Sequence, residues 1–305
     1  MSAILVTGSE GLIGTAVCEL LAKSGYRVER LDLRSSDPGE KGDIRDEALM
    51  QERMRGCRGV VHLAAISRVA DGESDPELCW QTNVIGTEVV MRAAAAMPIR
   101  PWVLLASSRE VYGEPGQLPV REDTPMRPAN VYGRSKAAAE RVALAWRRSG
   151  VETAVVRLAN VYGATNDNPK RVAPAFARSA LEGGLLSVHG RENTFDFTHL
   201  DDVALGLLSV IEALQAGEVL PPIQLASGLP TTLGELAEIA VRLAGGRAKV
   251  AEVPAPAYNV SRFVGDPGRA KELLGWQARI RIGEGMHRLI ESFRHEAKPP
   301  SSNVA

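Results

Sequence analysis

The chain has 305 residues, of which 45% are hydrophobic and 24% charged, and its formal net charge is -1. A charge this close to zero, with basic and acidic residues interspersed, excludes the strong positive field of most nucleic-acid-binding and membrane-surface proteins. The length suits one large α/β domain, or one domain with a small second lobe.

The first half of the chain alternates short apolar segments with segments of helical spacing. This rhythm is typical of parallel strands joined by helices that cover both faces of a sheet. The expected strands are 3–8, 26–32, 59–65, 101–107 and 153–159, and the expected helices are 12–23, 45–55, 76–97 and 131–149.

After residue 160, proline and glycine punctuate shorter elements, which predict a smaller lobe of mixed strand and helix. The predicted fold class is α/β, a Rossmann-like doubly wound parallel sheet with a smaller C-terminal substrate-binding lobe. The expected boundaries are 1–160 for the NAD-binding domain, with its sheet completed by segments near 190–230, then 161–295 for the lobe and 296–305 for a disordered tail.

Three glycines, Gly8, Gly11 and Gly14, lie between the first expected strand and the first expected helix. Glycine in this turn lets backbone N–H groups approach a pyrophosphate, and the helix N-terminus favours its negative charge. Asp32 ends the second strand, about 20 residues further on, where a carboxylate can accept hydrogen bonds from ribose hydroxyls. This favours NAD over NADP, although Arg34 can bind a 2′-phosphate and keeps NADP open as the less favoured cofactor.

A tyrosine and a lysine at the start of the helix expected at 131–149 carry the strongest chemical signal. Tyr132 and Lys136 are four residues apart and therefore share a face of that helix. We expect the ammonium to stabilise the phenolate and to lower the pKa of Tyr132 from about 10 towards about 7. Such a tyrosine can take a proton from a hydroxyl while hydride leaves the same carbon for a nicotinamide. Ser107 and Ser108 end the fourth strand, at the edge where ligands collect in a doubly wound sheet.

Three cysteines lie far apart, without the spacing of a metal site or of a CxxC pair. An odd count without such spacing favours a reduced compartment. No apolar run approaches the ~18 residues that a membrane-spanning helix requires, and no secretory signal pattern precedes the first strand. We expect a cytoplasmic protein without a metal site and without a nucleic-acid or membrane partner.

Short motifs follow one another in a consistent order to about residue 290: VTGSEGLIG, LDL, GDIRD, VVHLAA, NVIGT, SSREVYG, YGRSK, RLANVYG, FDFTHLDDVA and KELLGW. Their order and content resemble the extended short-chain dehydrogenase/reductase family, in its nucleotide-sugar NAD-dependent epimerase/dehydratase branch. The resemblance implies NAD as the cofactor, a nucleotide sugar as the substrate, and a homodimer built from the helices at 76–97 and 131–149.

The resemblance also implies roles for individual residues. Ser108 is expected to hydrogen-bond the reacting sugar oxygen, Tyr132 to act as the general base, and Lys136 to support it and to bind the nicotinamide ribose. The expected cofactor contacts are Gly8, Gly11, Leu12, Ile13, Gly14, Asp32, Asp43, Ile44, Leu63, Ala64, Ala65, Asn83, Tyr132 and Lys136. The expected substrate contacts are Ser108, Asn160 and Arg262. Core packing remains an alternative for Leu63, Ala64 and Ala65, and a structural cap for Asn83.

The charged pair Arg109-Glu110 follows the catalytic serine. The resemblance implies small or hydroxylic residues here in plain 4-epimerases, Asp-Glu in 4,6-dehydratases, and a glutamate at the second position in decarboxylases. Glu110 is therefore a further candidate catalytic residue. Arg109 stays charged at physiological pH, which disfavours an ordinary dehydratase. It can pair with Glu110, bind an anionic group such as a uronate carboxylate, or face outward or pair locally while Glu110 hydrogen-bonds backbone.

A second departure from the family pattern concerns the substrate diphosphate. Phe195 stands where an arginine usually grips that diphosphate, and Arg191 or Arg171 can replace it from nearby. Arg262 matches the other diphosphate-binding arginine.

The sequence as a whole predicts an NAD-dependent epimerase of a nucleotide-diphosphate sugar, most simply a 4-epimerase. The alternatives are an NAD(P)-dependent sugar dehydrogenase or reductase, or a decarboxylase, of the same family. A non-catalytic NAD-binding sensor is a third reading, which the intact Ser108, Tyr132 and Lys136 disfavour.

Overall fold

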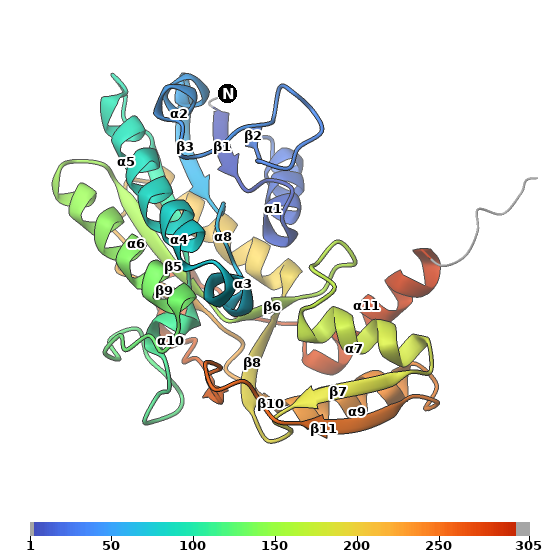
Figure 1. The fold of residues 1–305 in the computed structure, drawn as a ribbon. Helices are drawn as coiled ribbons and strands as arrows, with labels where there is room; N and C mark the ends of the chain where they lie inside the picture. The colour runs from blue at the N-terminus through green and yellow to red at the C-terminus, as the bar shows by residue number, and fades with distance from the viewer. Residues whose placement is uncertain (1–2, 297–305) are drawn as a thin grey trace, which may run out of the picture.

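The computed structural model describes residues 3–296 and shows a parallel sheet flanked by helices, with a smaller lobe at its carboxyl edge (Figure 1). The tail expected at 296–305 lies outside the described residues, except for Glu296, which ends the last helix. None of the helices within residues 3–296 is both long and apolar enough to cross a membrane.

Six parallel strands form the main sheet, in the order β2-β1-β3-β4-β5-β9. Their bounds are β1 Ala3–Thr7, β2 Arg27–Leu31, β3 Cys57–His62, β4 Trp102–Ser108, β5 Thr153–Leu158 and β9 Ile223–Leu225. The chain runs from β1 outward to β2 and then returns to the other side of β1. The strand order therefore reverses between β1 and β3, where doubly wound sheets bind their ligands.

Side chains that alternate along each strand pack on opposite faces of this sheet. Ile4 and Val6 of β1 pack in one cluster with helices α1 (Leu12–Lys23) and α8 (Leu200–Gln215). Ala3 and Leu5 pack in another with α2 (Glu47–Met54), α5 (Gly86–Ala96) and α6 (Val131–Arg148). Because both faces are covered, strands inside the sheet such as β1 and β4 are buried along their whole length and mostly apolar, whereas the edge strand β2 (RVERL) is charged and partly exposed.

The helix expected at 76–97 is observed as a continuous helical segment that is interrupted by a π-helical turn. It consists of α4 (Pro76–Trp80), a π-helical turn η1 (Gln81–Ile85) and α5. The other expected helices and strands start and end within about three residues of their observed bounds. The largest difference is at the strand expected at 59–65, which is observed at Cys57–His62. A short helix α3 (Val69–Ser74) was not expected, since its sequence VADGES is rich in weak helix formers.

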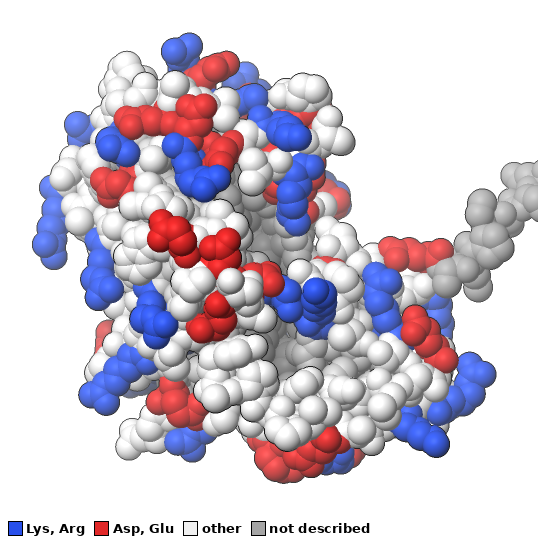
Figure 2. Space-filling model, viewed as in Figure 1, with Lys and Arg blue, Asp and Glu red and all other residues white. Residues whose placement is uncertain are grey.

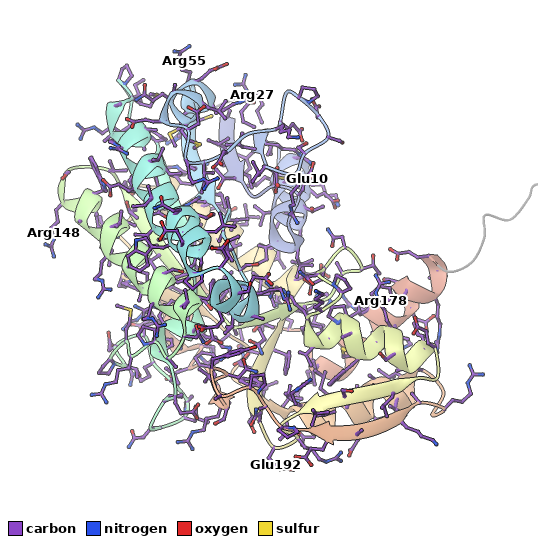
Figure 3. All side chains as sticks on the ribbon, viewed as in Figure 1. Glu10, Arg27, Arg55, Arg148, Arg178 and Glu192 are labelled. Carbon is purple, nitrogen blue, oxygen red and sulfur yellow. The ribbon has the colours of Figure 1, made fainter. Side chains whose placement is uncertain are left out.

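The smaller lobe encloses its own apolar cluster. Its helices are α7 (Val172–Leu181), α9 (Leu233–Leu243) and α11 (Ile282–Glu296), beside the strand pair β7 (Leu185–His189) and β11 (Lys249–Val253), and a helix α10 (Gly268–Leu274) lies against β9. Arg178 of α7 (labelled in Figure 3) lies 4.3 Å from the ring centroid of Phe293 in α11. A small sheet of β6 (Asn160–Tyr162), β8 (Thr194–His199), β10 (Pro230–Thr232) and β12 (Arg262–Phe263) links the lobe to the main sheet.

Candidate active site

One cavity of about 940 Å³ extends from the glycine loop to the start of α7. It lies at the carboxyl ends of the main-sheet strands, and Figure 2 shows a hollow between the main domain and the lobe. Lys, Arg, Asp and Glu side chains are interspersed over this face of the molecule. Within residues 3–296 no group of His, Cys, Asp or Glu side chains is arranged to hold a metal ion.

The glycine loop is shaped by close backbone contacts that only glycine permits. Gly8 has a φ of +73°, and a Cβ atom there would lie 2.7 Å from the backbone nitrogen of Ala64. A Cβ atom on Gly14 would lie 2.0 Å from the carbonyl oxygen of Gly8. The loop therefore presents bare backbone at the N-terminus of α1, where a pyrophosphate is favoured. Gly11, Leu12 and Ile13 line the cavity beside it, so the residues fit a dinucleotide.

Asp32 forms the adenosine end of the cavity. Its side chain is buried, one oxygen accepts a hydrogen bond from the backbone of Glu10 (3.0 Å), and the other accepts one from the backbone of Arg34 (2.9 Å). The side chain of Glu10 itself is exposed at the turn before α1 (Figure 3). Asp32 thus points a fixed carboxylate where the ribose of NAD is expected, and Asp43 and Ile44 line the same end.

Ser108, Tyr132 and Lys136 line the other end of the cavity. Ser108 is the last residue of β4, and the other two lie in the first turns of α6. That helix begins at Asn130, whose side-chain oxygen accepts a 2.7 Å hydrogen bond from the backbone of Gly133. The sheet edge and the helix cap together bring the three side chains to one place.

Burial has the largest effect on the pKa values of Tyr132 and Lys136. Desolvation raises the pKa of Tyr132 above its ordinary value, although the Ser108 side chain and the charge of Arg171 oppose the rise. The prediction that Lys136 lowers the pKa of Tyr132 is therefore wrong for the protein alone. Desolvation also lowers the pKa of Lys136 to about 8, against the opposing charge of Glu140.

A buried charged network behind Lys136 was not predicted. Glu140 accepts hydrogen bonds from Ser107 (2.5 Å) and from Arg157 (2.7 and 2.9 Å). Arg157 in turn donates to the hydroxyl of Tyr112 at 3.0 Å. The i, i+4 spacing of Lys136 and Glu140 was the available signal, because it places both on one face of α6.

Arg109 and Glu110 both point into the site. Nη2 of Arg109 lies 2.8 Å from Oε1 of Glu110, and the two side chains are 11% and 7% exposed. Nε of Arg109 donates to Asn160 (2.7 Å), and Nη1 is buried without a hydrogen-bond partner among residues 3–296. Oε2 of Glu110 accepts a 2.8 Å hydrogen bond from Asn130. Of the interpretations left open by the sequence, the pairing of the two side chains is observed and the outward-facing arginine is wrong.

Two phenylalanines form the wall beside Arg109. Phe195 of β8 and Phe263 of β12 are register partners, and the Arg109 guanidinium lies 4.6 and 5.8 Å from their ring centroids. Such stacking on aromatic faces is favourable for arginine. The position that usually carries an arginine in the family thus holds an aromatic ring on which a different arginine rests.

Arg262 does not line the cavity, and its role as a substrate contact stays a prediction. Its guanidinium donates to the carbonyl of Pro115 (3.1 Å) and lies 3.5 Å from Glu114. The register explains this placement, since Phe263 rather than Arg262 pairs with Phe195. Arg191 forms an ion pair with Glu238 and is also absent from the cavity lining.

Arg171, by contrast, lines the cavity. Its Nη2 donates to the backbone and hydroxyl oxygens of Ser67. Of the two arginines proposed as replacements for the diphosphate grip, it is the one that the structure brings to the site.

For Asn83, too, the cofactor contact stays a prediction. It lies in the π-helical turn and not in the cavity lining, and its buried amide accepts from Ile66 N (2.9 Å) and donates to Ile66 O (3.0 Å) and Ser135 (2.9 Å). These hydrogen bonds to backbone and to Ser135 fit the alternative that Asn83 has a structural role. Leu63, Ala64, Ala65 and Asn160 all line the cavity.

Comparisons with known proteins agree with this geometry. A family model described as NAD dependent epimerase/dehydratase family matches residues 4–224. The putative UDP-glucose 4-epimerase of Methanocaldococcus jannaschii is 31% identical, over 96% of this chain and 98% of the relative. UDP-glucuronic acid decarboxylase 1 of Danio rerio is 27% identical, over 98% of this chain and 74% of the relative.

Solved structures of MoeE5 are similar to this chain over nearly its whole length. The complex with UDP-glucose and NAD has a TM-score of 0.90 and 28% identity, covering 97% of this chain and 100% of that one. The complex with UDP-glucuronic acid and NAD has a TM-score of 0.87 and 27% identity, covering 96% and 99%.

Proposed function

The chain belongs to the NAD-dependent epimerase/dehydratase family and uses NAD, and on that premise we propose that it inverts C4 of a nucleotide-diphosphate sugar. One observation carries the proposal: Ser108, Tyr132 and Lys136 line the same cavity as the glycine loop and Asp32. A sugar hydroxyl at Tyr132 is then within reach of a dinucleotide that extends from the loop.

In the proposed reaction Tyr132 removes the proton of the C4 hydroxyl while Ser108 hydrogen-bonds the same oxygen. Bound NAD supplies the acceptor for the hydride that leaves C4 and returns it to the ketone. Between these steps the ketosugar turns in the cavity, so that its other face is reduced, and Tyr132 gives the proton back. Because burial raises the pKa of Tyr132 in the protein alone, the proposal requires the ammonium of Lys136 to stabilise the phenolate once NAD and substrate are bound.

The engagement of Glu110 favours epimerisation over elimination of water. An eliminating enzyme needs a carboxylate that is free to take a proton, whereas both oxygens of Glu110 are occupied. Arg109 also stands where the family resemblance implies the acid of a dehydratase. A guanidinium cannot supply that proton.

Decarboxylation of a nucleotide uronate is the second candidate. It is favoured by the glutamate at position 110 and by the similarity to the Danio rerio decarboxylase. The complexes of MoeE5 with UDP-glucose and with UDP-glucuronic acid make these two compounds the first substrates to try.

The test is to incubate the purified protein with each compound and to identify the products by NMR. We expect the C4 epimer, without release of carbon dioxide and without net reduction of added NAD. Tyr132→Phe should lower kcat by at least about 100-fold, the lower end of what a positioned acid–base group contributes, and should still bind NAD. Tyr26→Phe is the matched control, because that hydroxyl bonds Gln215 outside the cavity. Full activity of Tyr132→Phe would remove the tyrosine from the mechanism.

A further inference from the structure

A carboxylate in a cavity where a C4 ketone forms can act as a base and cause a side reaction at C5. A ketone at C4 makes the proton on C5 acidic, because the electron pair of the C5–H bond can move into the carbonyl. Glu110 lines this cavity, two residues beyond Ser108, and its charge raises the pKa of Tyr132. Its carboxylate therefore lies near the reacting end of the substrate.

A cation lies beside one oxygen of this carboxylate, and an amide donates to the other. Arg109 Nη2 lies 2.8 Å from Oε1, and Asn130 Nδ2 donates to Oε2 at 2.8 Å. A carboxylate acts as a base through an oxygen lone pair. The cation beside Oε1 and the donor on Oε2 therefore occupy the two oxygens through which Glu110 would have to act.

Arg109 is itself held in place on three sides. Its Nε donates to Asn160, and its guanidinium rests on Phe195 and lies close to Phe263. Asn130 is fixed as well, because its side-chain oxygen caps α6. Arg109 and Asn130 are thus each held by contacts of their own, and they contact different oxygens of Glu110.

We propose that Arg109 determines reaction specificity, by holding Glu110 so that it cannot take the C5 proton of a 4-keto intermediate. This inference rests on the proposed function, since the ketone is the intermediate of C4 inversion. With Arg109 removed, Glu110 takes the C5 proton and the C–H electron pair forms the enolate of the C4 ketone. A solvent-derived proton then returns to C5, and nothing is oxidised or reduced.

The experiment measures exchange of the C5 proton with solvent. The holoenzyme is incubated in D2O with UDP-4-keto-6-deoxyglucose, a stable ketone with no leaving group at C6, and deuterium at C5 is followed by NMR and mass spectrometry. Arg109→Met keeps an apolar stem against the phenylalanines and removes every donor. We expect it to incorporate deuterium at C5 at least about 100-fold faster than the wild type, as expected for a positioned base.

Two variants serve as controls. Arg109→Lys keeps a cation beside Glu110 and should remain close to the wild type. In Arg109→Met/Glu110→Gln the base is gone, so exchange should return to the wild-type rate. Asn130→Ser removes the other donor but keeps a side chain that caps α6, and it carries the same prediction if Arg109→Met does not fold.

Wild-type exchange rates in folded Arg109→Met and Asn130→Ser would overturn the inference, and so would rapid exchange that persists without Glu110. The ketone is supplied directly, so this result does not depend on hydride transfer. Failure of C4 inversion in the wild type would refute the proposed function separately.

Discussion

At the scale of single residues, the properties of the cavity depend on the burial and the hydrogen-bond partners of its polar side chains. Tyr132 and Ser108 were predictable because their types and spacing carry the chemistry. The pKa of Tyr132 was not, since it depends on burial, which spacing does not reveal. Arg262 lies outside the cavity lining for a related reason: side chains alternate along β12, so that Phe263 is buried and Arg262 is exposed.

His62 shows what full burial does to a titratable group. It lies between Thr7 (2.8 Å) and Thr87 (3.1 Å), and desolvation lowers its pKa from 6.5 to about 3. The unfolded chain therefore binds a proton below about pH 6.5 that the folded chain refuses, so acid favours unfolding. The contribution of neutral His62 to stability is present above pH 6.5 and is lost as the pH falls towards 3.

We predict that this one histidine lowers the free energy of unfolding by about 2 kcal/mol between pH 7 and pH 5. Urea titrations of the wild type and of His62→Asn at both pH values measure the effect as a difference, which cancels the other titrating groups. The advantage of the wild type should shrink by that amount at pH 5. An unchanged difference would mean that His62 titrates normally.

At the scale of elements, the sequence pattern predicted most strands of the main sheet and the helices that cover them. The strands of the main sheet are short apolar runs buried on both faces, and their helices follow from apolar spacing. The small sheet of the lobe was not predictable in this way. Its strands have two to six residues and are joined by pairings between distant segments, such as β12 with β8. Nothing in a three-residue run such as IQL of β9 indicates that it ends a sheet begun 220 residues earlier.

The π-helical turn η1 was not predictable from the sequence, which indicated one continuous helix over 76–97. Asn83 uses this turn to hold the backbone of Ile66, which lines the cavity, and the hydroxyl of Ser135 in α6. Wide turns of this kind are frequent at functional sites. Here the turn ties the loop after β3 to α6, the helix that carries Tyr132 and Lys136.

Asn83→Ala should accordingly act on stability. It leaves buried backbone groups of Ile66 without their partner, which should cost about 2 kcal/mol of unfolding free energy or more. Asn166→Ala, at an exposed asparagine whose one hydrogen bond is 3.5 Å long, is the matched control and should change little. Denaturant unfolding without NAD measures both, and equal stability of the two variants would contradict the structural role of Asn83.

At the scale of the whole molecule, family membership and geometry support one account. The glycine loop and Asp32 fit NAD, and the lobe closes the other end of the cavity. Arg109 and Asn130 contact the carboxylate of Glu110, the base that we propose they restrain. The homodimer stays a prediction. Leu78, Trp80 and Ile85, on the helical run expected to form it, are about two-fifths exposed (40%, 41% and 39%).

The most direct test of the central claim follows the hydrogen on C4. UDP-glucose and UDP-glucuronic acid, each deuterated at C4, are converted in ordinary water with unlabelled NAD bound to the protein. If C4 is oxidised and reduced again within one active site, the C4 epimer should retain its deuterium at C4, with none in the solvent. An epimer without deuterium, or keto and decarboxylated products in place of an epimer, would contradict the account.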